Sequence, residues 1–275
     1  MNPPADSGVT PPPTSSDRLR LSEATNIDGL FFSQNGDIFA AEGFNGTKIF
    51  RITDDGTVTT YADGLSGPID IAEDDDGNLY VTNFLGSSVS RVRTDGTVEA
   101  FAQVDPFPAG IVRAPDGQFY VSIYGAADLT SGLGTGTIIH EISADGTVTE
   151  FSSGGELMAP VGIDLGPDGT VYTANFHDGR VIAIAADGSQ TVLASLLSEV
   201  EGLGIGHVAI AQGKLYATSI SGLEVLSVDI TDSSVTSVAN APRPNGITFV
   251  PDSATLFVAA GNTETSSLRK VQLTQ

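Results

Sequence analysis

Apolar and polar residues alternate along most of the chain in short runs, which glycine-containing turns separate. One series of turns reads QNGDIF, DDGNLY, PDGQFY, PDGTVY, AQGKLY and PDSATLF, and a second reads DDGTV, TDGTV, ADGTV, ADGSQ and TDSSV. Asp-Gly and Asn-Gly between alternating apolar runs predict β-hairpins, because glycine tolerates the positive φ angles that such turns require. Helical repeats are excluded, since the apolar positions follow a period of two.

The two series of turns recur together, at intervals of about 40 to 45 residues and one of about 52. Each repeat holds four strands, which we call A to D and which read GLFFS, DIFAAE, KIFRI and TVTTYA in the first repeat. Four-stranded units of this length are typical of propeller blades. The sequence therefore predicts an all-β fold, a six-bladed β-propeller with four-stranded blades.

The two ends of the chain indicate how the ring closes. The sixth repeat ends at VQLTQ after its third strand, and the alternating segment Arg18 to Glu23 precedes the first repeat. We expect this N-terminal strand to pair with the last blade, which leaves no open edge between them. Residues 1–17 hold five prolines among small polar residues, so we expect a disordered tail before a propeller over residues 18–275.

The charge and composition exclude several classes of function. The chain has 34 acidic and 12 basic residues, a net charge of −22, which disfavours binding to nucleic acids and to anionic membranes. An acidic surface that maintains solubility explains this charge, and recruitment of divalent cations is the alternative. There is no cysteine, hence no disulfide or thiolate chemistry, and no apolar run approaches the roughly 18 residues of a membrane span.

A tail such as residues 1–17 commonly follows an export signal, so we expect an extracytoplasmic protein, periplasmic or extracellular.

Strand A lines the central channel of a propeller, so we expect functional residues at the start of this strand. The aligned blades carry Asp28, Ile69, Ala109, Val161, Gly206 and Asn245 at the channel entry, followed by Gly29, Asp70, Gly110, Gly162, His207 and Gly246. Small residues are expected here because strands crowd near the axis. The polar residues Asp28, Asp70, His207 and Asn245 stand out against that background.

The ends of strand B form a second ring at the same mouth. They carry Glu42, Asn83, Ile123, Asn175, Ser219 and Ala260. Together with Asp28, Asp70 and Asn245, Glu42 and Asn83 belong to the sixth, first and second blades, which are neighbours around the ring. Oxygen donors therefore gather on one side, as Ca²⁺ prefers. Asn83 and Asn175 are candidate substrate-binding residues. Each of these side chains could equally cap a turn at a blade corner.

The histidines and one long connection add candidate chemistry. His140 lies in strand C of the third blade, where we expect a partly exposed sheet residue. His177, in the NFHDG turn, and His207 come from adjacent blades, and as a pair they could act as acid and base, hold a metal, or merely bind water. We take Asp70, His177 and His207 as candidate catalytic residues. The connection from Tyr124 to Gly136 is about ten residues longer than its counterparts, which predicts a lid or binding loop, with Tyr124 contacting the ligand, or a tolerated surface insertion.

The repeat G-x-x-x-[DN]-x-x-G-x-[LV]-[YF]-V, which runs from about residue 24, resembles NHL-type propellers. It also resembles the superfamily of senescence marker protein, gluconolactonase and luciferin-regenerating enzyme, with strictosidine synthase and virginiamycin B lyase as further relatives. The segment RPNGITFVPDSATLFVA is similar to the PNG segment of gluconolactonases, whose asparagine binds a divalent metal. By this resemblance Asn245 is a metal ligand and Asp28, in NIDGLFF, is a second. The family's glutamate ligand corresponds to Ala109 here, which leaves Asp70 or Glu42 to complete the ligand set.

Two functions remain open on the sequence. The first is a hydrolase of a lactone or ester, in which Asp28, Asn245 and Glu42 hold Ca²⁺ or another divalent cation that activates a water. The second is a non-catalytic propeller that presents its mouth to a small-molecule ligand or a protein partner. Histidine pairs with a partnering acid, which the lyase relatives need, could come only from His177 and His207.

Overall fold

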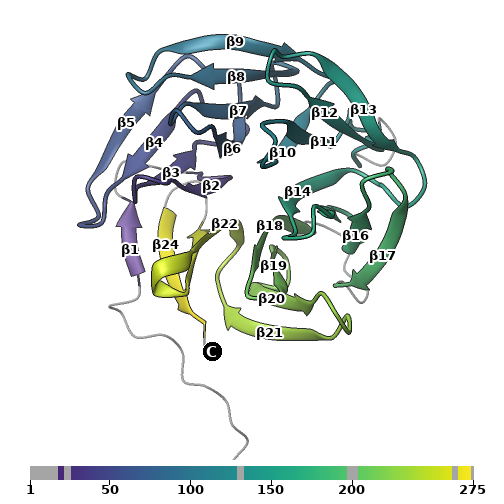
Figure 1. Cartoon of the computed structure of the whole chain (residues 1–275). Helices are drawn as coiled ribbons and strands as arrows, with labels where there is room; N and C mark the ends of the chain where they lie inside the picture. The colour runs from purple at the N-terminus through teal and green to yellow at the C-terminus, as the bar shows by residue number, and fades with distance from the viewer. Residues whose placement is uncertain (1–17, 22–25, 129–132, 197–203, 262–265, 274–275) are drawn as a thin grey trace, which may run out of the picture.

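The computed structural model describes residues 18–21, 26–128, 133–196, 204–261 and 266–273, and these form a ring of six blades (Figure 1). Each blade is a four-stranded antiparallel sheet, which confirms the predicted six-bladed propeller. The segment 1–17, predicted as a disordered tail, lies outside the described residues. Within the described part of the chain, no helix is long and apolar enough to cross a membrane.

In the first five blades the strands follow the chain from the channel outwards. Blades one to three consist of β2 (Leu30–Phe32), β3 (Ile38–Ala41), β4 (Ile49–Ile52) and β5 (Val58–Ala62); β6 (Pro68–Glu73), β7 (Leu79–Asn83), β8 (Ser88–Val92) and β9 (Val98–Gln103); and β10 (Pro108–Arg113), β11 (Phe119–Ile123), β12 (Ile138–Ile142) and β13 (Val148–Ser153). Blades four and five consist of β14 (Pro160–Leu165), β15 (Val171–Asn175), β16 (Arg180–Ile184) and β17 (Gln190–Ser195); and β18 (Ile205–Ala211), β19 (Lys214–Ser219), β20 (Glu224–Asp229) and β21 (Val235–Asn240).

The sixth blade takes strands from both ends of the chain. It contains β22 (Pro244–Val250), β23 (Thr255–Gly261) and β24 (Ser266–Gln272), with a single turn of 3₁₀-helix, η2 (Pro251–Ser253), between β22 and β23. Its outermost strand is β1 (Arg18–Leu21), which pairs antiparallel with β24 so that Leu19 lies opposite Leu268. The N-terminal strand thus covers the edge that β24 would otherwise expose.

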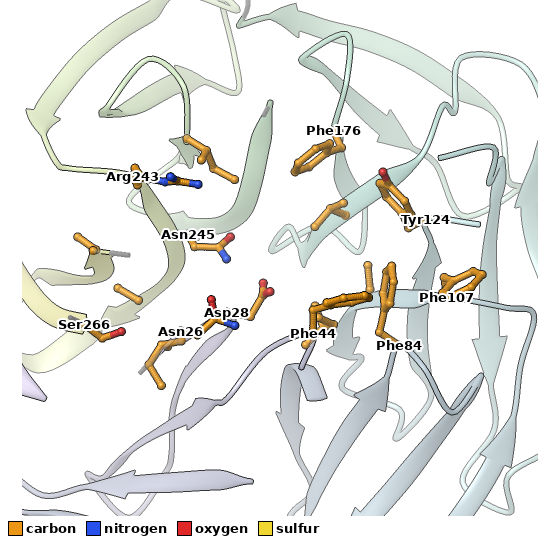
Figure 2. A pocket seen from close by; sticks show the side chains of 18 of the residues that line it. Asn26, Asp28, Phe44, Phe84, Phe107, Tyr124, Phe176, Arg243, Asn245 and Ser266 are labelled. Atoms are coloured by element: carbon orange, nitrogen blue, oxygen red, sulfur yellow. The ribbon is translucent and has the colours of Figure 1, made fainter. Parts of the chain in front are cut away.

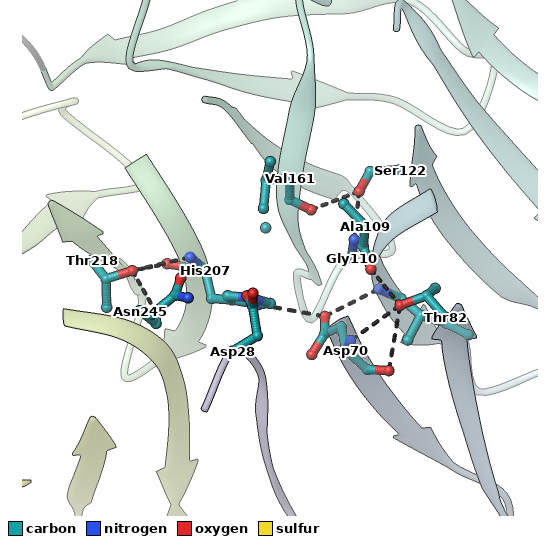
Figure 3. Close-up of polar contacts among 12 residues, drawn as sticks. Asp28, Asp70, Thr82, Ala109, Gly110, Ser122, Val161, His207, Thr218 and Asn245 are labelled. Atoms are coloured by element: carbon teal, nitrogen blue, oxygen red, sulfur yellow. Dashed lines mark hydrogen bonds and ion pairs between the residues drawn. The ribbon is translucent and has the colours of Figure 1, made fainter. Parts of the chain in front are cut away.

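The inner strands share an irregularity where they enter the channel. In blades two to six the pairing of strands A and B shifts register at the two residues that begin the channel wall, for example between Pro68 and Ile71. Such a bulge leaves backbone groups without a ladder partner. A strand B hydroxyl supplies the partner: Thr218 accepts the N–H of His207 at 3.0 Å and donates to the carbonyl of Asn245, in the next blade, at 2.7 Å (Figure 3).

The same arrangement recurs in two other blades. Thr82 and Ser122 make the equivalent bonds from the second to the third blade and from the third to the fourth. Neighbouring backbones approach so closely here that a Cβ on Gly110 would lie 2.3 Å from the carbonyl oxygen of Val161. This explains the small residues that the sequence shows near the axis, and the rest of the core fills the spaces between neighbouring blades.

Candidate functional site

A cavity of about 640 Å³ opens at the mouth where the entry residues lie. Its volume is in the range of pockets that bind drug-sized ligands. Figure 2 shows that its wall has two unlike halves. The polar half carries Asn26, Asp28, Arg243, Asn245 and Ser266, and the aromatic half carries Phe44, Phe84, Phe107, Tyr124 and Phe176.

The aromatic half is a connected set of rings. The ring of Phe84 lies 5.0 Å from that of Phe107 and 5.7 Å from that of Tyr124, centroid to centroid, and Tyr124 lies 5.8 Å from Phe176. Phe44, 45% exposed, extends the set to the outer rim, 5.5 Å from Phe84. Rings at these spacings form a continuous apolar wall.

Part of the cavity wall comes from a backbone position that the sequence reasoning missed. Asn26, Phe107 and Arg243 each lie two residues before the channel entry of their blade, with φ angles of 58°, 63° and 45°. Left-handed backbone costs a residue with a Cβ roughly 1–2 kcal/mol, so the fold holds these side chains toward the mouth against a local preference. The alignment that identified the entry position would also have identified this one.

The imidazole ring of His207 lies buried inside the channel between two carboxylates (Figure 3). Its Nε2 lies 3.0 Å from Oδ1 of Asp28, and its Nδ1 lies 3.7 Å from Oδ2 of Asp70. Burial alone would lower the pKa of His207, but the charge of Asp70 and the hydrogen bond to Asp28 outweigh it and raise the pKa to about 10. At neutral pH this ring is therefore an imidazolium. It belongs to the fifth blade and contacts carboxylates of the first and second blades across the channel.

This arrangement does not fit a divalent cation. Asp28 and Asn245 are two oxygen donors at the mouth, but the third position is Ala109, which is buried and apolar. Asp70 accepts the N–H of Ile111 at 3.1 Å and lines the opposite mouth instead. A cation beside Asp28 would also be repelled by the His207 imidazolium. Among the described residues, no three His, Cys, Asp or Glu side chains are arranged as ligands of one ion.

Three residues predicted from the ends of strand B do not line the cavity. Glu42 accepts the N–H of Thr47 at 2.8 Å within its own turn. Asn83 and Asn175 each accept a backbone N–H from the connection that enters their blade, at 3.1 and 2.9 Å. These side chains stabilise blade corners, which is the alternative that the sequence left open for them.

The two histidines predicted as a pair have different partners. His177 accepts the N–H of Gly134 at 3.0 Å through Nε2, which also lies 3.1 Å from the hydroxyl of Tyr124. Because an accepting nitrogen carries no proton, the ring proton is on Nδ1, and burial lowers the pKa of His177. This neutral ring fastens the long connection of the third blade to the fourth. Residues 129–132 of the predicted lid lie outside the described residues, while Tyr124 lines the cavity as expected.

Two other titratable groups, His140 and Asp164, do not line this cavity. His140, in β12, is 8% exposed rather than partly exposed, and its Nε2 lies 2.9 Å from Asp105. A second cavity of about 410 Å³ opens at the opposite mouth, lined by Asp70, His207 and Asp164 among others. Burial raises the pKa of Asp164 to about 6, although its carboxylate accepts the N–H groups of Ile210 and Leu165.

Comparison with known proteins places these features in a family context. The model of the virginiamycin B lyase family matches residues 21–270. Among solved structures, virginiamycin B lyase from Staphylococcus aureus is 19% identical with a TM-score of 0.67, over 90% of this chain and 81% of that chain. A gluconolactonase from Xanthomonas campestris is 18% identical with a TM-score of 0.74, over 98% of each chain.

A chain of the nidogen/laminin complex is 20% identical with a TM-score of 0.63, over 78% of this chain and 79% of that chain. At these identities the structural likeness shows the fold alone. The search of curated proteins gives no match.

Proposed function

Because the chain belongs to the virginiamycin B lyase family, we propose that it is an enzyme that cleaves an ester bond, such as that of a lactone, in a small molecule held in the mouth cavity. The observation that carries this proposal is the carboxylate of Asp28, the one acidic side chain among the described residues of the cavity wall, which contacts the His207 imidazolium at 3.0 Å. The side chain of Asp28 is 20% exposed, so it can reach a bound ligand.

Asp28 is the base in this proposal. In a lyase reaction the carboxylate removes a proton from the carbon next to the one that bears the ester oxygen. A carbon–carbon double bond then forms, and the carbon–oxygen bond breaks with a carboxylate as leaving group. In a hydrolase reaction Asp28 instead takes a proton from the water that attacks the carbonyl carbon. Asn245, on the same half of the cavity, would donate its amide N–H to the oxygen on which negative charge develops.

The experiment uses mass spectrometry with quinupristin and gluconolactone, molecules associated with relatives of this chain. A cyclic ester opened by elimination keeps its mass, whereas one opened by hydrolysis gains the mass of one water. We expect Asp28→Asn to lower kcat by about 100-fold or more. The matched control is Asp95→Asn, since Asp95 lies in an exposed turn and its replacement can still accept the N–H of Thr97. An Asp28→Asn variant with full kcat would disprove the role of Asp28.

A second candidate function is non-catalytic ligand binding. It is favoured by the absence of histidine and glutamate from the described residues that line the cavity. In that case the wild type would retain a ligand unchanged through prolonged incubation. Exposed Phe44, Leu85 and Leu223 on turns between strands B and C would suit a protein partner at the same mouth.

A further inference from the structure

Among the arginines whose side chains the structure describes, Arg243 stands out because its guanidinium has no partner in the described residues and faces the mouth cavity. Five of the others, namely Arg51, Arg91, Arg93, Arg113 and Arg180, form ion pairs with Asp or Glu. Within the described part of the chain, the guanidinium of Arg243 has neither an ion pair nor a hydrogen bond, although the protein carries 34 acidic and only 12 basic residues. Carboxylates are thus abundant, yet none of those in the described residues pairs with this group.

The fold fixes the backbone of Arg243 at the cavity wall, and its side chain is exposed. Its φ of 45° lies in the left-handed region, and it stands between Pro242 and Pro244. The carbonyl of Pro242 accepts the N–H of Gly261 at 2.9 Å, and Pro244 begins β22. A strained backbone position of this kind is typical of residues that serve a site.

The charge around Arg243 favours an anion. Asp28 is the only acidic residue among the described residues lining the cavity, and the His207 imidazolium contacts it at 3.0 Å. The neighbours of Arg243 on the polar half, Asn245 and Ser266, are neutral. A planar guanidinium binds carboxylate, sulfonate or phosphate oxygens through two parallel N–H bonds.

The aromatic half fixes what else the ligand contains. Phe84, Phe107, Tyr124 and Phe176 face the polar half across the cavity (Figure 2). A ligand that contacts both halves needs an apolar or aromatic body at one end and an anionic group at the other. We propose that the mouth cavity selects amphiphilic anions, with Arg243 as the residue that binds the anionic group. As a substrate class, this rests on the proposed ester-cleaving function.

The test uses two fluorescent probes with the same aromatic body. 8-Anilinonaphthalene-1-sulfonate carries an anionic sulfonate, and N-phenyl-1-naphthylamine is its neutral counterpart. We expect the wild type to bind the sulfonate at least tenfold more tightly, because hydrogen bonds to charged groups are the strong ones. Added NaCl should reduce this preference.

Variants assign the preference to its residue. Arg243→Gln should abolish the tenfold preference and leave the affinity for the neutral probe unchanged, while Arg243→Lys should keep part of it. Phe107→Ala should weaken both probes together. Arg93→Gln is the matched control, since Arg93 lies at an exposed outer position beside Glu99.

Two results would overturn the inference: equal binding of the two probes by the wild type, or a preference that persists in Arg243→Gln. Circular dichroism spectra of each variant, compared with the wild type, would check that the variant is folded. Because the probes are not substrates, anion selectivity without ester cleavage would count against the proposed function alone. Ester cleavage without anion selectivity would count against this inference alone.

Discussion

Replacing His207 by Asn tests whether the charge inside the channel stabilises the ring. Asn has no charge, fits the space that the imidazole leaves, and offers one amide donor toward Asp28 or Asp70. The variant therefore leaves two carboxylates facing each other at the axis without the cation between them. We expect the free energy of unfolding to fall, and to fall in a pH-dependent way.

The magnitude follows from the contacts of His207. A pKa of about 10 in the folded protein, against an ordinary 6.5, corresponds to about 5 kcal/mol. Removing one partner of a buried ion pair costs about 3–5 kcal/mol. Asp28 is 20% exposed and water screens part of its charge, so we expect a loss of about 3 kcal/mol at pH 6.

The sign of the pH dependence follows from the raised pKa. The stabilisation from His207 is fully present below pH 6.5 and is lost as the pH rises to about 10. Urea unfolding at pH 6, 7, 8.5 and 10 should therefore show the wild type approaching His207→Asn as the pH rises. His140→Asn is the control, since His140 pairs with the half-exposed Asp105, a contact that water screens. Parallel pH profiles for wild type and His207→Asn would refute the reasoning.

Three further changes test other parts of the structure. The pKa of Asp164 is raised from 3.8 to about 6, so the wild type should lose stability relative to Asp164→Asn as the pH rises from 4 to 6 in urea titrations. Gly110→Ala places a Cβ 2.3 Å from the Val161 carbonyl oxygen and should cost about 1–3 kcal/mol in thermal unfolding. CaCl₂ should leave the wild-type Tm unchanged but raise the Tm of His207→Ala, in which no imidazolium lies between Asp28 and Asp70. A wild type stabilised by Ca²⁺ would contradict our conclusion that these residues do not fit a divalent cation.

The fold could be predicted because its signal is periodic. Asp-Gly and Asn-Gly turns recur in register along the chain, and each blade repeats the same four strands, so errors in single strands do not change the total. The exceptions are local. Asn26, Phe107 and Arg243 adopt positive φ angles that composition assigns to glycine, so a turn rule based on glycine could not find them.

The site was predicted less completely because its contacts cross the ring. The sequence alignment placed Asp28, Asn245 and Tyr124 at the mouth, where the cavity contains them. The alignment could not distinguish these cavity residues from Glu42, Asn83 and Asn175. A polar residue at the end of a strand gives the same sequence pattern whether it caps a turn or faces a ligand. His207 was paired with the neighbouring blade, whereas its partner Asp28 lies 179 positions earlier in the chain, across a channel whose width no local pattern encodes.

The propeller therefore separates architecture from chemistry by position. The bulge repeats in five blades and the bridging strand B hydroxyl in three, while the side chains near the channel entry differ from blade to blade. The residue after the entry is glycine in four blades, so Asp70 and His207 put charge where the other blades have no side chain. The imidazolium then occupies the space beside Asp28 that a cation would need, and this follows from one substitution in a repeat rather than from a change of fold. We therefore expect the charges of His207 and Arg243, rather than the blade pattern, to determine which ligands this mouth accepts.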